Sequence, residues 1–133
     1  MIITAPEGCG KKLILILLAL KRFSNEEEGT LVFATHSKQL SQEIASTLAV
    51  LTRTPIINLS MEEWQSDVKK CIVIGTPVKL SQLTKAKKDS FLILSILEAD
   101  LLLDFGYDDP LNQLATSIPS NVIYQLCAIK IGM

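Results

Sequence analysis

The sequence lacks a long hydrophobic run, a cysteine motif and an excess of charge of either sign. Its longest apolar run, residues 13–20, is far shorter than the ~20 residues that a membrane-spanning helix needs. The segment before this run contains Pro6 and Glu7 and differs from the basic start of a secretory signal. The three cysteines lie far apart with no C-x-x-C motif, which favours free thiols in a reducing compartment. We therefore expect an intracellular protein, nuclear or cytoplasmic, with no membrane partner.

Charge is nearly balanced, because 13 lysine and arginine residues face 14 aspartate and glutamate residues, for a net charge of -1. Any binding of nucleic acid must therefore come from local groups rather than from a basic field over the whole surface. Hydrophobic residues, by contrast, are abundant: they make up 48% of the 133 residues, and the mean hydropathy is +0.34. This composition excludes disorder and indicates a single domain, residues 1–133, with a buried sheet.

Short β-branched runs alternate with amphipathic stretches along the whole chain. That alternation is typical of an α/β domain, and it predicts a mostly parallel sheet of about six strands with helices on both faces. The predicted strands are residues 1–4, 31–34, 55–59, 71–75, 92–97 and 122–127. The predicted helices are residues 11–23, 38–51, a short one after Pro77, 99–103 and 110–118. Segments 24–29 and 85–89 are rich in charge and are predicted to be surface connections.

The first candidate site is a glycine-rich loop, residues 5–12, between the first predicted strand and the first predicted helix. In a phosphate-binding loop, glycines let backbone N–H groups approach the phosphates, and a lysine neutralises the phosphate charge. Here Lys12 stands where a hydroxyl would hold Mg²⁺, and Glu7 places a carboxylate near the expected polyanion. An ordinary strand-to-helix turn is the alternative for the loop taken alone. The candidate nucleotide-binding residues are Ala5, Glu7, Gly8, Cys9, Gly10, Lys11 and Lys12.

Two further segments follow predicted strands, and therefore lie on the same expected edge of the sheet. Thr76 and Pro77 have the chemistry of a helix N-cap followed by proline at the first helical position. Glu98 and Asp100 follow the most apolar strand, where nucleoside triphosphatases keep their metal ligand and their water-polarising base. These two acids are the candidate catalytic residues. The alternative is a pair of acids that favour a helix N-terminus through its dipole.

Taken together, five segments resemble the first RecA-like domain of the DEAD-box RNA helicases, in the same order. Residues 5–12 resemble the family's A-x-T-G-x-G-K-T loop, 36–40 its P-T-R-E-L, 75–80 its G-T-P-G-R-L, 97–100 its D-E-A-D and 127–129 its S-A-T. The resemblance covers essentially the whole chain and implies a RecA-like P-loop fold, ATP as the nucleotide and RNA as the partner. Residues 98–107 further resemble members linked to assembly of the large ribosomal subunit, which implies a nucleolar location and pre-ribosomal partners.

The resemblance also implies a set of RNA-facing positions, which need only helix N-termini, hydroxyls and cations to contact the sugar-phosphate backbone. These positions are Ser37, Lys38, Thr76, Pro77 and Lys79. For the lysines of segment 85–89, we weigh an extension of this surface against a solvated loop and favour the loop. His36 is predicted to have a surface or capping role, and Trp64 to lie in a helix that packs on the sheet.

The departures from the family pattern cluster on the metal site. In the family, the loop threonine and the first acidic residue hold Mg²⁺. The matching residues here are Lys12 and Leu97, which offer no lone pair to a cation, so we assign no metal ligand and do not expect Mg²⁺ to be held. Lys11 and Glu98 match the phosphate lysine and the water-polarising glutamate. At the S-A-T position, residues 127–129 lack the two hydroxyls that would link nucleotide state to RNA binding.

The sequence begins at the strand before the loop and ends after the sixth predicted strand. We therefore expect neither the family's adenine-reading segment nor its second RecA-like domain. The prediction is a DEAD-box-like domain that binds RNA, with ATP as a candidate ligand and with hydrolysis that is weak or absent on its own. Two alternatives stay open. One is an active helicase subunit completed in trans, and the other is a non-catalytic interaction module or truncated remnant.

Overall fold

The computed structural model describes residues 2–4, 11–64, 69–98, 102, 104 and 106–128. Its strands are β1 (Ile2–Thr4), β2 (Gly29–Ala34), β3 (Ile56–Asn58), β4 (Lys70–Gly75), β5 (Phe91–Leu97) and β6 (Ile123–Ala128). Its helices are α1 (Lys11–Phe23), α2 (Lys38–Leu51), α3 (Pro77–Ser81), α4 (Lys85–Lys88) and α6 (Asp108–Ser117). Strands and helices alternate through most of the chain, as the sequence predicts.

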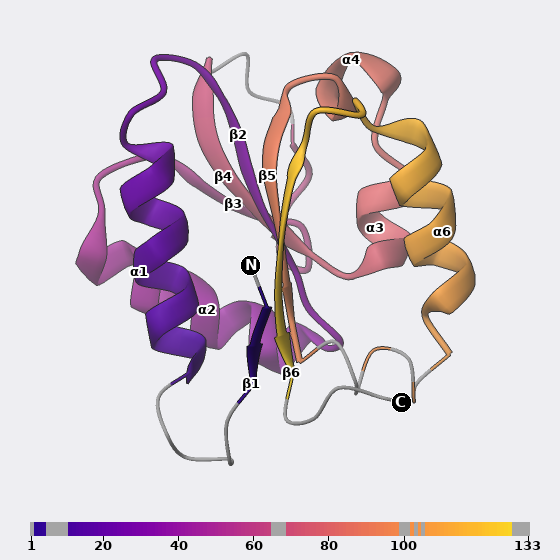
Figure 1. Ribbon diagram of the computed structural model, residues 1–133, viewed down its shortest axis with the longest axis horizontal. Helices are drawn as coiled ribbons and strands as arrows, with labels where there is room; N and C mark the ends of the chain where they lie inside the picture. The colour runs from indigo at the N-terminus through magenta and orange to yellow at the C-terminus, as the bar shows by residue number, and fades with distance from the viewer. Residues whose placement is uncertain are drawn as a thin grey trace.

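The six strands form one sheet in the order β1-β6-β5-β2-β4-β3 (Figure 1). Every pairing between neighbouring strands is parallel. All strands therefore end at one edge of the sheet, and the loops that leave them gather there. The predicted α/β class with a parallel sheet is confirmed.

Helices cover both faces of this sheet, with α1 and α2 on one side and α3 and α6 on the other (Figure 1). On the first face, Leu15 of α1 and Leu48 of α2 are fully buried in one apolar cluster with β-strand residues. On the second face, Leu80 of α3 and Leu114 of α6 belong to a separate cluster. Each fully buried leucine stabilises the fold by about 1.5–3 kcal/mol relative to an exposed one. Burial on both faces explains why β2 and β4 are nearly continuous apolar runs.

The predicted strands are all present, with ends that differ by at most two residues. The largest difference is at β2, which starts at Gly29 rather than at Leu31. Thr30 is buried there and its hydroxyl bonds to Ser90, so a polar residue forms part of a strand that hydrophobicity alone would start later. The predicted helices 11–23 and 38–51 and the short helix after Pro77 are confirmed. The predicted helix 99–103 lies largely outside the described residues.

Two local details of secondary structure differ from the prediction. Segment 85–89 contains the one-turn helix α4, which begins after Thr84 because the Thr84 hydroxyl accepts a hydrogen bond from the Lys87 N–H. Helix α6 starts at Asp108 instead of Pro110. Proline is tolerated in a first helical turn, whose N–H groups have no intrahelical partner, so Pro110 does not mark the start of the helix.

Trp64 packs onto the sheet as predicted, but it does so from a segment without helical structure. Only 6% of its surface is exposed. The Lys87 ammonium donates to the Trp64 carbonyl and lies 5.2 Å from the centre of the indole ring, so the lysine covers one side of the indole. Where the structure describes the chain, no helix has the length and apolar character needed to cross a membrane.

Candidate functional site

The candidate site lies where the chain leaves three neighbouring strands, β5, β2 and β4. Ala34, the last residue of β2, pairs with Gly75 of β4 on one side and with Ile96 of β5 on the other. The predicted site residues that follow these strands therefore emerge next to one another at the carboxyl edge of the sheet. This adjacency is a property of the strand order, since the three segments are far apart along the chain.

The loop after β2 is fixed by a network of short hydrogen bonds. Ser37 is the N-cap of α2, and its side-chain oxygen accepts a hydrogen bond from the Leu40 N–H at 3.1 Å. The Ser41 hydroxyl donates to the Ser37 carbonyl at 3.1 Å and is paired with the Thr35 hydroxyl at 2.6 Å. Because Thr35 and Ser41 are both fully buried, these bonds hold the start of α2 firmly against the end of β2. Lys38, the first residue of α2, is exposed.

The loop after β4 has the same construction on a smaller scale. Thr76 is the N-cap of α3, its hydroxyl accepts from the Lys79 N–H at 3.4 Å, and Pro77 occupies the first turn as predicted. The Thr35 N–H donates to the Gly75 carbonyl at 3.0 Å, so the loops after β2 and β4 are joined directly. Lys79 is exposed. The structure thus places the predicted RNA-facing residues at adjacent strand ends, with two hydroxyl caps and an exposed lysine in each of the helices that follow.

Glu98 follows β5 and contacts His36, which follows β2. The Nε2 atom of His36 and the Oε2 atom of Glu98 form a short hydrogen-bonded contact, and each side chain is 16% exposed. Glu98 has φ of 53°, a left-handed backbone conformation that is costly for a residue with a side chain. His36 was predicted to have a surface or capping role, and that prediction is wrong because the imidazole is mostly buried and contacts the candidate catalytic carboxylate.

The His36 contact was missed because the two residues are 62 positions apart. Only the order of the strands places them together: Ala34 pairs with Ile96, and His36 and Glu98 each lie two residues further on. Both side chains line a hollow of about 180 Å³ together with Ser37, Gln39, Leu40 and Glu43. The hollow therefore joins the start of α2 to the end of β5.

The glycine-rich loop and Asp100 lie outside the described residues. Of the candidate nucleotide-binding residues, Ala5, Glu7, Gly8, Cys9 and Gly10 are not described, and only the backbone of Lys11 and Lys12 is described. Both lysines form the start of α1, directly after the loop that follows β1. A helix N-terminus in that place is the geometry that phosphate groups favour.

Leu97 stands where the family pattern has an acidic metal ligand, so its surroundings show whether this position can bind a metal ion. Its side chain is fully buried in the cluster under α1 and α2, next to the backbone turn at Glu98. A buried alkyl group offers no lone pair and cannot be exchanged for water, so this position does not fit a Mg²⁺ ligand. Leu97 therefore offers no ligand to a metal ion at the end of β5.

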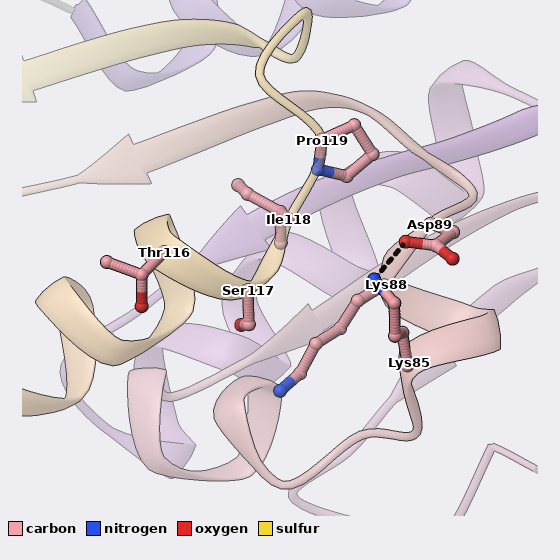
Figure 2. Close-up of a pocket in the computed structure, with 7 residues that line it drawn as sticks. All are labelled: Lys85, Lys88, Asp89, Thr116, Ser117, Ile118 and Pro119. Carbon is pink, nitrogen blue, oxygen red and sulfur yellow. Dashed lines mark hydrogen bonds and ion pairs between the residues drawn. The ribbon is translucent and has the colours of Figure 1, made fainter.

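The lysines of segment 85–89 do not extend the site. Helix α4 precedes β5, so it lies at the opposite edge of the sheet from the loops after β2 and β4 (Figure 1). Lys85 pairs with Asp89 at 3.4 Å, and Lys88 donates to the Ser81 carbonyl at 2.6 Å. Lys85, Lys88 and Asp89 form a hollow with residues at the end of α6 (Figure 2). Its volume is about 450 Å³. The preferred interpretation, a surface segment outside the RNA-facing face, agrees with this position.

A parallel α/β sheet with polar loops at the carboxyl ends of its central strands defines the class of doubly wound ligand-binding domains. Within that class, the family model described as DEAD/DEAH box helicase matches residues 1–128. The chain therefore belongs to the DEAD/DEAH box helicase family.

Two relatives and one solved structure illustrate the similarity. The chain is 29% identical to the ATP-dependent rRNA helicase SPB4 of Encephalitozoon cuniculi, with 91% of this chain and 29% of the relative covered. It is 28% identical to the ATP-dependent RNA helicase DBP9 of Saccharomyces cerevisiae, with 90% and 24% covered. The structure of a S. cerevisiae Dbp5 variant bound to RNA and ADP BeF3 superposes with a TM-score of 0.77 at 20% identity, with 98% and 36% covered. The chain thus spans under a third of the length of these two relatives. The similarity to the solved structure confirms the predicted RecA-like fold.

Proposed function

We propose that the chain is an RNA-binding domain of the DEAD-box type that also binds ATP and whose own ATP hydrolysis is weak or absent. The observation that carries the proposal is the meeting of two capped loops at adjacent strand ends, each followed by a helix with an exposed lysine. Hydroxyls and ammonium groups at neighbouring strand ends suit contacts with the phosphates of a single strand. The relatives' names, an rRNA helicase among them, support RNA as the partner. Pre-ribosomal RNA in the nucleolus is the proposed target, and it rests on the resemblance of residues 98–107 to members linked to assembly of the large ribosomal subunit.

The proposal of weak hydrolysis rests on three residues. Glu98 retains the carboxylate that would orient an attacking water molecule. Leu97 is buried and apolar where the family pattern has an acidic metal ligand, and Lys12 replaces the hydroxyl of the loop. Bound Mg²⁺ would supply charge stabilisation to the transferring phosphoryl group, and these residues give it no protein ligand. Nucleotide contacts then come from Lys11 and from the N–H groups at the start of α1.

RNA binding is tested by fluorescence anisotropy with a short fluorescein-labelled oligouridylate. Lys38→Ala and Lys79→Ala should each weaken binding and lower its dependence on salt, because each removes about one phosphate contact. Lys21→Ala is the matched control, since Lys21 is an exposed lysine in the last turn of α1, away from the carboxyl edge. Equal affinities for all four proteins would refute the RNA face. Absence of binding by the unaltered chain would favour a protein-interaction module.

Nucleotide binding is tested separately by calorimetric titration with ATP and ADP, with and without Mg²⁺. Lys11→Ala should abolish the heat of binding if the loop holds phosphate, and the affinity of the unaltered chain should not depend on Mg²⁺. A strong Mg²⁺ dependence, together with hydrolysis that Glu98→Gln abolishes, would instead support the enzyme completed in trans. No heat from a folded sample at high nucleotide concentration would refute ATP binding.

A further inference from the structure

The contact between His36 and Glu98 joins two parts of the proposed site that are separate in sequence. His36 directly precedes Ser37, the cap of α2 on the proposed RNA face. Glu98 carries the carboxylate that the proposed function assigns to hydrolysis. Their side chains meet across the ends of β2 and β5, so a hydrogen bond joins the two parts of the site.

Both partners are held so that a movement of one affects the other. The loop of His36 is anchored on each side, because the Thr35 N–H bonds to Gly75 and Ser41 bonds to Ser37. Glu98 sits in a left-handed backbone conformation, and such a conformation persists only where the surroundings determine it. The contact with the His36 imidazole is one of the interactions that hold Glu98 in this conformation. Loss of the contact leaves the Glu98 turn with less to hold it in a costly conformation.

The hollow of about 180 Å³ beside the His36–Glu98 contact provides a way to test the contact against simple electrostatics. Glu43 and Glu98 both line the hollow, and a carboxylate disfavours a phosphate group placed beside it. By Coulomb's law alone, removal of either carboxylate should leave RNA binding unchanged or make it tighter. If the His36–Glu98 contact helps to hold the RNA-facing loop in place, removal of the Glu98 carboxylate should instead weaken RNA binding. Glu43 does not make this contact and serves as the comparison.

We propose that His36 is a positioning residue that links the RNA-facing start of α2 to the side chain of Glu98, so that RNA binding and the orientation of this carboxylate depend on each other. The inference rests on the proposed function, because it needs RNA at the start of α2. Thermodynamic linkage requires that a bond which changes when RNA binds also changes RNA affinity when it is removed.

The decisive experiment compares RNA affinity among a small set of variants, measured by anisotropy with the same labelled oligouridylate. Glu98→Ala and His36→Phe should each weaken binding about fivefold, the low end of measured couplings between sites. Their double variant should be no weaker than either single variant, because both remove the same bond. Glu98→Gln keeps an acceptor for the imidazole and should restore affinity. Glu43→Gln is the matched control and should bind as well as the unaltered chain or better.

The outcomes separate the link from the function on which it rests. If Lys38→Ala weakens RNA binding while Glu98→Ala and His36→Phe do not, the RNA face stands and the link is refuted. Additive losses in the double variant also refute it, because His36 would then act independently of Glu98. If the unaltered chain binds no RNA, both proposals fail together.

A second measurement follows His36 directly in the unaltered chain, with Glu98→Ala as its comparison. His36 is the only histidine in the sequence, so the ring nitrogens of ¹⁵N-histidine-labelled protein give one unambiguous pair of NMR signals. Saturation with oligouridylate should shift these signals, and the shift should be lost in Glu98→Ala. Ring signals that stay in place while RNA saturates the protein would overturn the link.

Discussion

Restoration of an acidic residue at Leu97 should unfold the domain rather than rebuild a metal site. Leu97 is fully buried in the apolar cluster that α1 and α2 form with the sheet. Truncation of a buried leucine costs about 2–5 kcal/mol, and an unpaired buried polar group adds about 1–3 kcal/mol. The sum, about 3–8 kcal/mol, is comparable with the whole stability of a typical domain, about 5–15 kcal/mol. Leu97→Asp is therefore expected to be largely unfolded or close to unfolding at neutral pH.

The assay is urea unfolding followed by circular dichroism at several pH values. Burial raises the pKa of the new carboxyl group above its value in the unfolded chain, which is about 3.9. A raised pKa in the folded state means that folding favours the protonated form, so the variant is most stable below about pH 4 and loses stability as pH rises. The loss approaches about 1.4 kcal/mol per pH unit until the folded-state pKa is passed. Leu97→Asn has no titrating group at this position, so its loss of unfolding free energy relative to the unaltered chain should be the same at every pH.

Leu13→Asp is the control for the chemical change itself, because Leu13 is 46% exposed in the first turn of α1. An acid there meets water and the favourable end of the helix dipole, so its stability should stay within about 0.5 kcal/mol of the unaltered chain. A Leu97→Asp protein as stable as Leu13→Asp at neutral pH would refute the assignment of Leu97 to the core. Tighter Mg²⁺-dependent nucleotide binding by that variant would refute the account of the lost metal site as well.

Three further outcomes follow from single contacts. Ser37→Ala should lower the free energy of unfolding by about 1 kcal/mol in urea melts, because it removes the cap of α2; an unchanged midpoint would contradict the cap. Gly29→Ala should lower the free energy of unfolding by about 1–3 kcal/mol, because Gly29 has φ of +122° and a Cβ there would lie 2.3 Å from Leu92 Cδ1. An unchanged midpoint in urea melts of this variant would contradict the strain. Burial raises the pKa of the Cys71 thiol, so iodoacetamide should label Cys71 in urea and not in the native protein at neutral pH, as read by mass spectrometry. Rapid native labelling would show that the thiol is accessible.

Much of the fold could be predicted because hydrophobic periodicity and capping chemistry act locally. The strands were found because burial on both faces leaves continuous apolar runs, as in Cys71–Gly75 of β4. Helix α2 was found to the residue because Ser37 is a cap and the apolar spacing continues to Leu51. Helix α4 was missed because a single turn has too few residues to show a period.

The candidate site was predictable only in part, because its residues meet through the strand order. Parallel strands put Ser37, Thr76 and Glu98 on one edge, and that much follows from the alternation of elements. Which strands are neighbours does not follow from it, and the pairing of β2 with β5 is what brings His36 to Glu98. A lone histidine at the end of a strand carries no local signal of a partner 62 residues away.

The lengths of the strands predict how backbone amides exchange their protons with solvent. β1 and β3 at the two edges have three residues each, while β2, β4 and β5 in the middle have six or seven and are bonded on both sides. Amides of the central strands should therefore exchange only when the whole domain opens, and those of the edges by local fraying. The loops of Ser37, Thr76 and Glu98 follow the slowest strands, so ligand binding there should change protection in the loops and leave the strands beneath them untouched.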